Sequence, residues 1–183
     1  MVKEWLKHKP HICYLQEIHL RTKDLYRLKV KEGMEKIFRA YGHEIKAGVA
    51  IFISDKINIQ TSAITRDKEG HHIILNGVAQ QENITLVNTF THNIGAPKYV
   101  RKVLEDFKKE VHNNTVIIGD FNTQLPTIDR LSKQKINKDI VALNDTLYQM
   151  DLVDVYRAFH PKEAKIYILY KCTWIIFKNT SHT

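Results

Sequence analysis

The sequence has only two cysteines among its 183 residues, and long hydrophobic runs are absent. Cys13 and Cys172 lie far apart and form no C-x-x-C pair, so they have the spacing of neither a metal site nor a redox pair. No apolar secretory segment opens the chain. The longest apolar stretches are the length of a strand and too short to span a bilayer. These absences predict a reduced, intracellular protein, nuclear or cytoplasmic, outside the membrane.

Acidic residues are in deficit, with 20 Asp and Glu against 28 Lys and Arg. The formal net charge is +8 and the sequence pI is about 9.4. Such a balance favours a polyanionic partner such as nucleic acid. Charge alone does not decide this, because many soluble proteins are modestly basic. With 43% hydrophobic residues, the chain is long enough for one sizeable core.

Strand-like and helix-like segments alternate along the chain, without internal repeats or a linker. The apolar patterning predicts strands over residues 11–15, 48–53, 71–75, 84–87 and 115–118, and it contains a further short run over residues 152–155. It predicts helices over residues 2–6, 97–112 and about 140–147. Asn76-Gly77 is a dipeptide typical of tight turns, and we expect it to join the third strand to the fourth. The pattern predicts one α/β or α+β domain.

Three places could carry chemistry, because polar side chains follow predicted buried strands there. They are Glu17, the segment 88–90, and Asp120 with Asn122. Mg²⁺ prefers one or two carboxylates together with waters and phosphate oxygens, and Glu17 could supply one of these carboxylates. Asp120 could activate a water for attack on phosphorus, while Asn122 could donate to a phosphate oxygen.

A purely structural interpretation stands beside this one. Gly-Asp-x-Asn after a strand is often a turn in which the Asp and Asn side chains bond to nearby backbone. A single glutamate such as Glu17 is usually a solvated loop residue. The ten histidines have no convincing metal spacing, and the lysines of the predicted helix 97–112 are most simply a solvated face.

The segment 15–20 (LQEIHL) resembles the L-Q-E-T-H-L segment of endonucleases from long interspersed (LINE) retrotransposons. These enzymes belong to the apurinic-endonuclease-like branch of the endonuclease/exonuclease/phosphatase superfamily. Further matches follow in the same order as in that family. They are 26–31 (YRLKVK), 46–51 (KAGVAI), 66–71 (RDKEGH), 93–97 (NIGAP), 118–123 (IGDFNT), 152–157 (LVDVYR) and 160–162 (HPK).

The resemblance implies an α/β fold, namely a partial four-layer sandwich of this superfamily that lacks the first strand and the last strands. It implies a Mg²⁺-dependent DNA-nicking endonuclease that takes no small-molecule cofactor. Glu17 matches the metal-binding glutamate. Asp120 and Asn122 match the aspartate and amide of the catalytic site, and Asn93 and Arg130 match positions near bound DNA.

Departures from the family predict that cleavage is defective. Phe90 stands where the family has an active-site tyrosine, and Thr91 and His92 also differ from the pattern. The amino-terminal asparagine of the metal site and the catalytic histidine have no counterpart. Residues from about Ile166 onward resemble the family's coding sequence read out of frame, which divides the chain into a partial domain, 1–165, and an out-of-frame tail, 166–183. A non-catalytic DNA-binding remnant and a translated relic without selected function remain alternatives.

Overall fold

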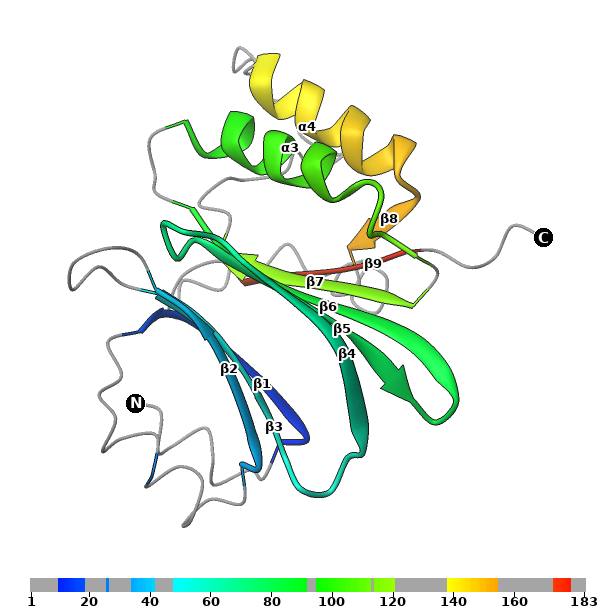
Figure 1. The fold of residues 1–183 in the computed structure, drawn as a ribbon. Helices are drawn as coiled ribbons and strands as arrows, with labels where there is room; N and C mark the ends of the chain where they lie inside the picture. Colours follow the sequence, from blue (N-terminus) through cyan, green and yellow to red (C-terminus); the bar gives the residue numbers. More distant parts are fainter. Residues whose placement is uncertain are drawn as a thin grey trace. The chain divides into compact units, whose positions relative to one another are not determined.

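The computed structural model describes residues 10–18, 26, 34–41, 48–91, 95–112, 114–120, 138–154 and 173–178. The chain divides into two compact units, Met1–Phe90 and Thr91–Thr183 (Figure 1). The predicted helix over residues 2–6 lies outside the described residues. No helix in the described part of the chain is long and apolar enough to cross a bilayer.

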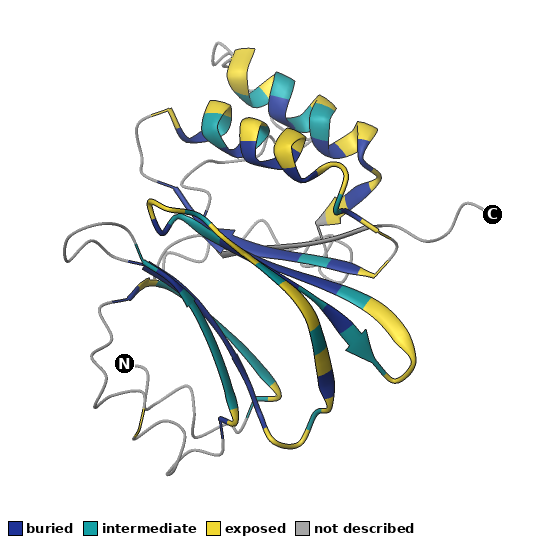
Figure 2. Cartoon of the chain, viewed as in Figure 1, coloured by how far each residue is buried: buried dark blue, intermediate teal, exposed yellow. Residues whose placement is uncertain are grey.

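The first unit contains an antiparallel three-stranded sheet with β3 (Gly48–Ile53) at its centre. Strands β1 (Ile12–Ile18) and β2 (Lys36–Ala40) pair with β3 on either side. All six residues of β3 are buried, as expected for an apolar run that does not alternate with polar residues (Figure 2). Ala50 and Phe52 pack against Ile18 and Met34, and the alternate residues of β3 are equally buried. Both faces of this central strand are therefore covered.

A second antiparallel sheet of the first unit runs from β4 (Ile59–Arg66) through β5 (His72–Ala79) to β6 (Glu82–Phe90). The pairing of β5 with β6 confirms the two strands predicted there, whereas β2 and β4 were not predicted. The predicted turn at Asn76-Gly77 is wrong, because both residues lie inside β5. The turn is made by Gln80 and Gln81, whose φ angles of 51° and 69° are left-handed.

Gly77 has a packing role in β5 instead of a turn role. A Cβ atom placed on it would lie 2.7 Å from the backbone carbonyl oxygen of Gln60 in the neighbouring strand β4. The pairing register changes nearby, between Thr61 and Ala63. Glycine is therefore needed here for the close approach of two backbones.

The second unit contains β7 (Thr115–Asp120), β8 (Leu152–Asp154) and β9 (Thr173–Lys178), with β9 pairing antiparallel to both others. Helices α3 (Ala96–Phe107) and α4 (Lys138–Gln149) pack side by side (Figure 1). Proline at the first turn of α3 agrees with the predicted start. The helix ends earlier than the predicted residue 112, since Lys108 N–H bonds to the Glu105 carbonyl oxygen in a tighter turn.

Strand β9 lies within the segment 166–183, which the sequence predicts to be translated out of frame. Its backbone pairs with β7 from Val116↔Phe177 to Asp120↔Thr173, and with β8 from Leu152↔Lys178 to Asp154↔Ile176. Residues 166–169, the other apolar run of this tail, lie outside the described residues. The apolar composition of residues 173–178 suits a strand whatever the reading frame that encodes it.

Candidate active site

Glu17 lies inside strand β1 and not in a loop after it, which corrects the boundary predicted at residue 15. The pairing of β1 with β3 shifts between Leu15 and Ile18, so that β1 carries one extra residue, as in a β-bulge. Glu17 has a φ of 49°, a left-handed conformation that costs a non-glycine residue roughly 1–3 kcal/mol. Its side chain is exposed, whereas the next residue, Ile18, is buried. The bulge therefore places a carboxylate at the surface of a strand whose other residues are partly or fully buried.

Asn88 stabilises the part of β1 that carries this bulge. Its side chain is fully buried, and its Nδ2 donates to the carbonyl oxygens of Leu15 at 3.0 Å and of Ala50 at 2.8 Å. Its Oδ1 accepts from Nε2 of Gln16 at 2.7 Å. Both amide hydrogens are used, and the side chain connects β6 to β1 and β3, so the two sheets of the first unit are joined next to Glu17.

Phe90 ends β6, two residues after Asn88, and the predicted end of this strand at residue 87 is too early. The Phe90 side chain is 4% exposed, and its backbone N–H donates to the His71 carbonyl oxygen at 2.8 Å. An aromatic ring fills the position, but phenylalanine has no hydroxyl that could donate a hydrogen bond to a phosphate.

Asp120 is the last residue of β7 in the second unit, where the sequence predicts a loop after residue 118. It is 1% exposed. Its backbone oxygen accepts hydrogen bonds from the N–H of Thr91 at 3.0 Å and from the Thr91 hydroxyl at 3.5 Å. Thr91, which departs from the family pattern, is itself buried and helps to fix the end of β7. The other predicted site residues, Asn122, Asn93 and Arg130, lie outside the described residues.

The described residues could supply part of a binding site for a divalent cation. They contain no group of three or more His, Cys, Asp or Glu side chains that could hold a metal ion. Within the first unit, Glu17 offers a single exposed carboxylate. Mg²⁺ accepts one or two carboxylates and completes its octahedron with water and phosphate oxygens. This donor set suits magnesium, whereas zinc needs three or four protein ligands.

Cys13 is not a candidate nucleophile. It lies in β1 among partly buried hydrophobic residues that pack against the core of the first unit. Burial raises the pKa of its thiol from 9.0 to about 11, so the reactive thiolate is scarce at neutral pH. Burial also raises the pKa of the neighbouring Tyr14 above its ordinary range.

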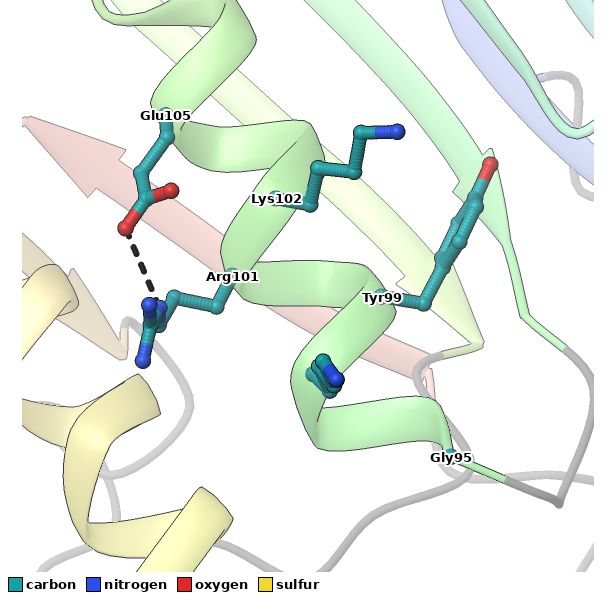
Figure 3. Close-up of a pocket in the computed structure, with 6 residues that line it drawn as sticks. Gly95, Tyr99, Arg101, Lys102 and Glu105 are labelled. Carbon is teal, nitrogen blue, oxygen red and sulfur yellow. Dashed lines mark hydrogen bonds and ion pairs between the residues drawn. The ribbon is translucent and has the colours of Figure 1, made fainter.

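A shallow cavity of about 420 Å³ lies on helix α3 of the second unit (Figure 3). Three basic residues line it, Lys98, Arg101 and Lys102, together with Gly95, Tyr99 and Glu105. Nε of Arg101 forms an ion pair with Oε1 of Glu105 at 3.0 Å. The sequence predicts that the lysines of this helix are simply solvated. Their grouping around one hollow could have been found from the i, i+3, i+4 spacing of the three cations.

No family model matches the chain. The structure is similar to D. rerio TDP2 complexed with single strand DNA product, at 12% identity and a TM-score of 0.65, over 100% of this chain and 77% of that one. It is also similar to AP endonuclease LMAP from Leishmania major, at 12% identity and a TM-score of 0.66, over 97% and 73%. The endonuclease domain of TRAS1, a telomere-specific non-LTR retrotransposon, matches at 14% identity and a TM-score of 0.58, over 84% of this chain and 64% of that domain.

At these identities the similarity concerns the fold. The chain has the α/β sandwich fold of these structures and covers part of it, which confirms the predicted fold class.

Proposed function

We propose that this chain is a LINE-type DNA endonuclease domain in which hydrolysis of the phosphodiester is impaired. The observation that carries the nuclease assignment is Glu17. Its carboxylate is exposed on a bulge with left-handed backbone, beside the buried Asn88 network. Strained backbone that the surrounding structure enforces is typical of functional sites. A fold shared with DNA-processing enzymes supports the same assignment.

In this proposal the residues have separate roles. Glu17 binds Mg²⁺, which when bound supplies positive charge beside the phosphate oxygens. The carboxylate of Asp120 accepts a proton from the attacking water, and the amide of Asn122 donates to a phosphate oxygen as charge develops there. Asn93 and Arg130 contact the DNA. Phosphodiester hydrolysis and DNA as partner both follow from these roles.

The phenylalanine at position 90 supports the proposal that phosphodiester hydrolysis is impaired. A preorganised hydrogen-bond donor that faces the developing charge is typically worth ~10²–10³ in rate. Phenylalanine at this buried position supplies none. Members of a catalytic unit fail together, so one lost donor lowers the contribution of the others.

Binding of DNA without catalysis is the second candidate. The net charge of +8 favours it, because phosphate contacts by Lys and Arg supply most of the sequence-independent affinity for DNA. A relic without selected function is the third. The three candidates differ in two measurable properties, namely nicking and salt-dependent DNA binding.

A plasmid-nicking assay with Mg²⁺ tests the proposal, using wild type, Asp120→Ala and Phe90→Tyr. We expect wild type to nick supercoiled plasmid no faster than Asp120→Ala does. We expect Phe90→Tyr to raise nicking by up to ~10², and a double variant that also carries Asp120→Ala to abolish this gain. Robust nicking by wild type that Asp120→Ala removes would contradict the impairment. Absence of any gain in Phe90→Tyr would contradict the role of the missing hydroxyl.

A further inference from the structure

Helix α3 carries three cations on its solvent side between residues 98 and 102. We call Lys98, Arg101 and Lys102 the α3 basic surface, and they are three of the six residues that line the shallow cavity on this helix (Figure 3). Lys98 and Lys102 are exposed, and Arg101 is partly exposed. The opposite face of the helix is apolar and buried, from Ala96 to Phe107. The cations therefore project from a helix whose position is fixed by core packing.

This charge arrangement is unfavourable for the helix itself. The amino-terminal end of a helix carries partial positive charge, so an acidic residue there stabilises it and a cation destabilises it by roughly 0.3–1 kcal/mol. The first turn of α3 contains Lys98 and no acidic residue, and its N-cap, Gly95, provides no side-chain hydrogen bond. Lys98 and Lys102 are also four residues apart, and like charges at that spacing repel by about 0.2–0.5 kcal/mol.

Internal ion pairing relieves little of this repulsion. Arg101 pairs with Glu105, so the acidic residue that lines this cavity already has a cationic partner. Among the described residues, neither Lys98 nor Lys102 forms an ion pair. A solvated lysine face would be equally soluble with the cations near the other end of the helix, where the dipole favours them. The arrangement is therefore better explained by an external anion than by solubility.

We propose that the α3 basic surface binds consecutive phosphates of a nucleic-acid backbone. Side chains at i and i+4 have Cβ atoms about 5–6 Å apart, which gives two cations on successive turns instead of one enclosed pocket. A shallow, open hollow suits an extended polyanion that lies along the surface, whereas a small anion would need an enclosed site. Tyr99 lines the same hollow and can contact a sugar or a base from its side. This inference rests on the proposed DNA partner and adds a binding surface that belongs to the second unit and does not include Glu17.

The test compares two double variants that remove the same charge. Lys98→Ala with Lys102→Ala removes the two unpaired cations of the surface. Lys108→Ala with Lys109→Ala removes two exposed lysines that follow the end of the same helix and lie outside this cavity. Binding of fluorescent single-stranded and duplex oligonucleotides is measured by anisotropy between about 50 and 200 mM NaCl, the range over which phosphate contacts weaken strongly.

We expect the first double variant to make the negative slope of log K against log salt shallower, by about 1.4 for single strands and about 1.8 for duplex, since each lost phosphate contact removes about 0.7 or 0.9. We expect the control variant to change the slope by less than about 0.5. The first variant should also melt at the same temperature as wild type or higher, because it loses the repulsion between two like charges four residues apart. A lower melting temperature would contradict the charge argument.

Several outcomes would overturn the inference, and they separate it from the proposed function. Equal losses in both double variants mean that net charge alone controls binding, while DNA remains the partner. Equal competition by polyglutamate and by unlabelled DNA of matched charge means that the surface takes any polyanion. No binding of DNA by wild type at about 50 mM salt removes the DNA partner itself, and the inference with it.

Discussion

Replacing Asn88 by alanine removes the side chain that joins the two sheets of the first unit. Its amide donates to two backbone carbonyls, those of Leu15 and Ala50, in a place that water does not reach. A net hydrogen bond is worth about 0.5–1.5 kcal/mol, and a buried group left without its partner costs about 1–3 kcal/mol. We therefore expect Asn88→Ala to lower the free energy of unfolding by about 2–4 kcal/mol, a large part of the roughly 5–15 kcal/mol typical of a domain.

Two further variants make this prediction specific. Gln16→Ala removes only the 2.7 Å bond to Oδ1 of Asn88, on a half-buried residue, and we expect a loss of about 0.5–1.5 kcal/mol. Asn88→Asp keeps the shape but sets a carboxyl against two carbonyl oxygens, so burial and these oxygens raise the pKa of the introduced carboxyl in the folded state. The free energy of unfolding of this variant should be greatest below pH ~4, the pKa of an aspartate in the unfolded state, and should fall as pH rises.

Urea denaturation followed by far-UV circular dichroism measures all three variants, at pH 4 and pH 7. A free energy of unfolding of Asn88→Ala within about 0.5 kcal/mol of wild type would contradict the role of this amide. An equal loss of stability by Asn88→Asp at both pH values would contradict it as well. A change in the slope of the unfolding free energy against urea concentration, without a change in the transition midpoint, would indicate that the unfolded ensemble has changed and not the buried network.

Two other predictions concern residues that have no role in the proposed hydrolysis. Because burial raises the pKa of Cys13 to about 11, alkylation of this thiol by iodoacetamide should be slow at pH 7.5, and its rate should still be rising at pH 10. Peptide-resolved mass spectrometry measures this rate. Fast labelling at pH 7.5 would contradict the buried placement. The same shift means that stability falls as pH rises from about 9 through 11. Gly77→Ala should destabilise the protein by about 1–3 kcal/mol, since the new Cβ lies 2.7 Å from the Gln60 carbonyl oxygen. Thermal melting tests this. Gly95→Ala is the control, because a Cβ there meets open space and is strained only by the φ of 72°.

The sequence could predict those segments in which the pattern of apolar side chains is clear. The apolar run of β3, the pairing of β5 with β6 and the buried face of α3 all appear as predicted. The choice of Glu17 and Asp120 as site residues stays a prediction, made because their residue types suit metal and water chemistry and because the colinear resemblance implies their roles. That resemblance also drew attention to Phe90.

Strand ends and turns were predicted less well. The strands ending in the candidate residues run up to three residues further than their apolar runs, because polar residues such as Asn88 and Asp120 are buried in β6 and β7. Asn76-Gly77 has the local chemistry of a turn, but the backbone of the neighbouring strand needs the space beside Gly77. Local propensity is a weak guide wherever a contact distant in sequence controls the conformation.

By itself, the sequence determined the apolar periods, the basic balance and the residue types available for chemistry, since these depend only on composition and spacing. Tertiary structure alone decided that Glu17 lies on a left-handed bulge and that the Asn88 amide joins two sheets beside it. The physical reason is that a buried amide finds partners 38 and 73 residues away along the chain, and no local pattern encodes such a bond.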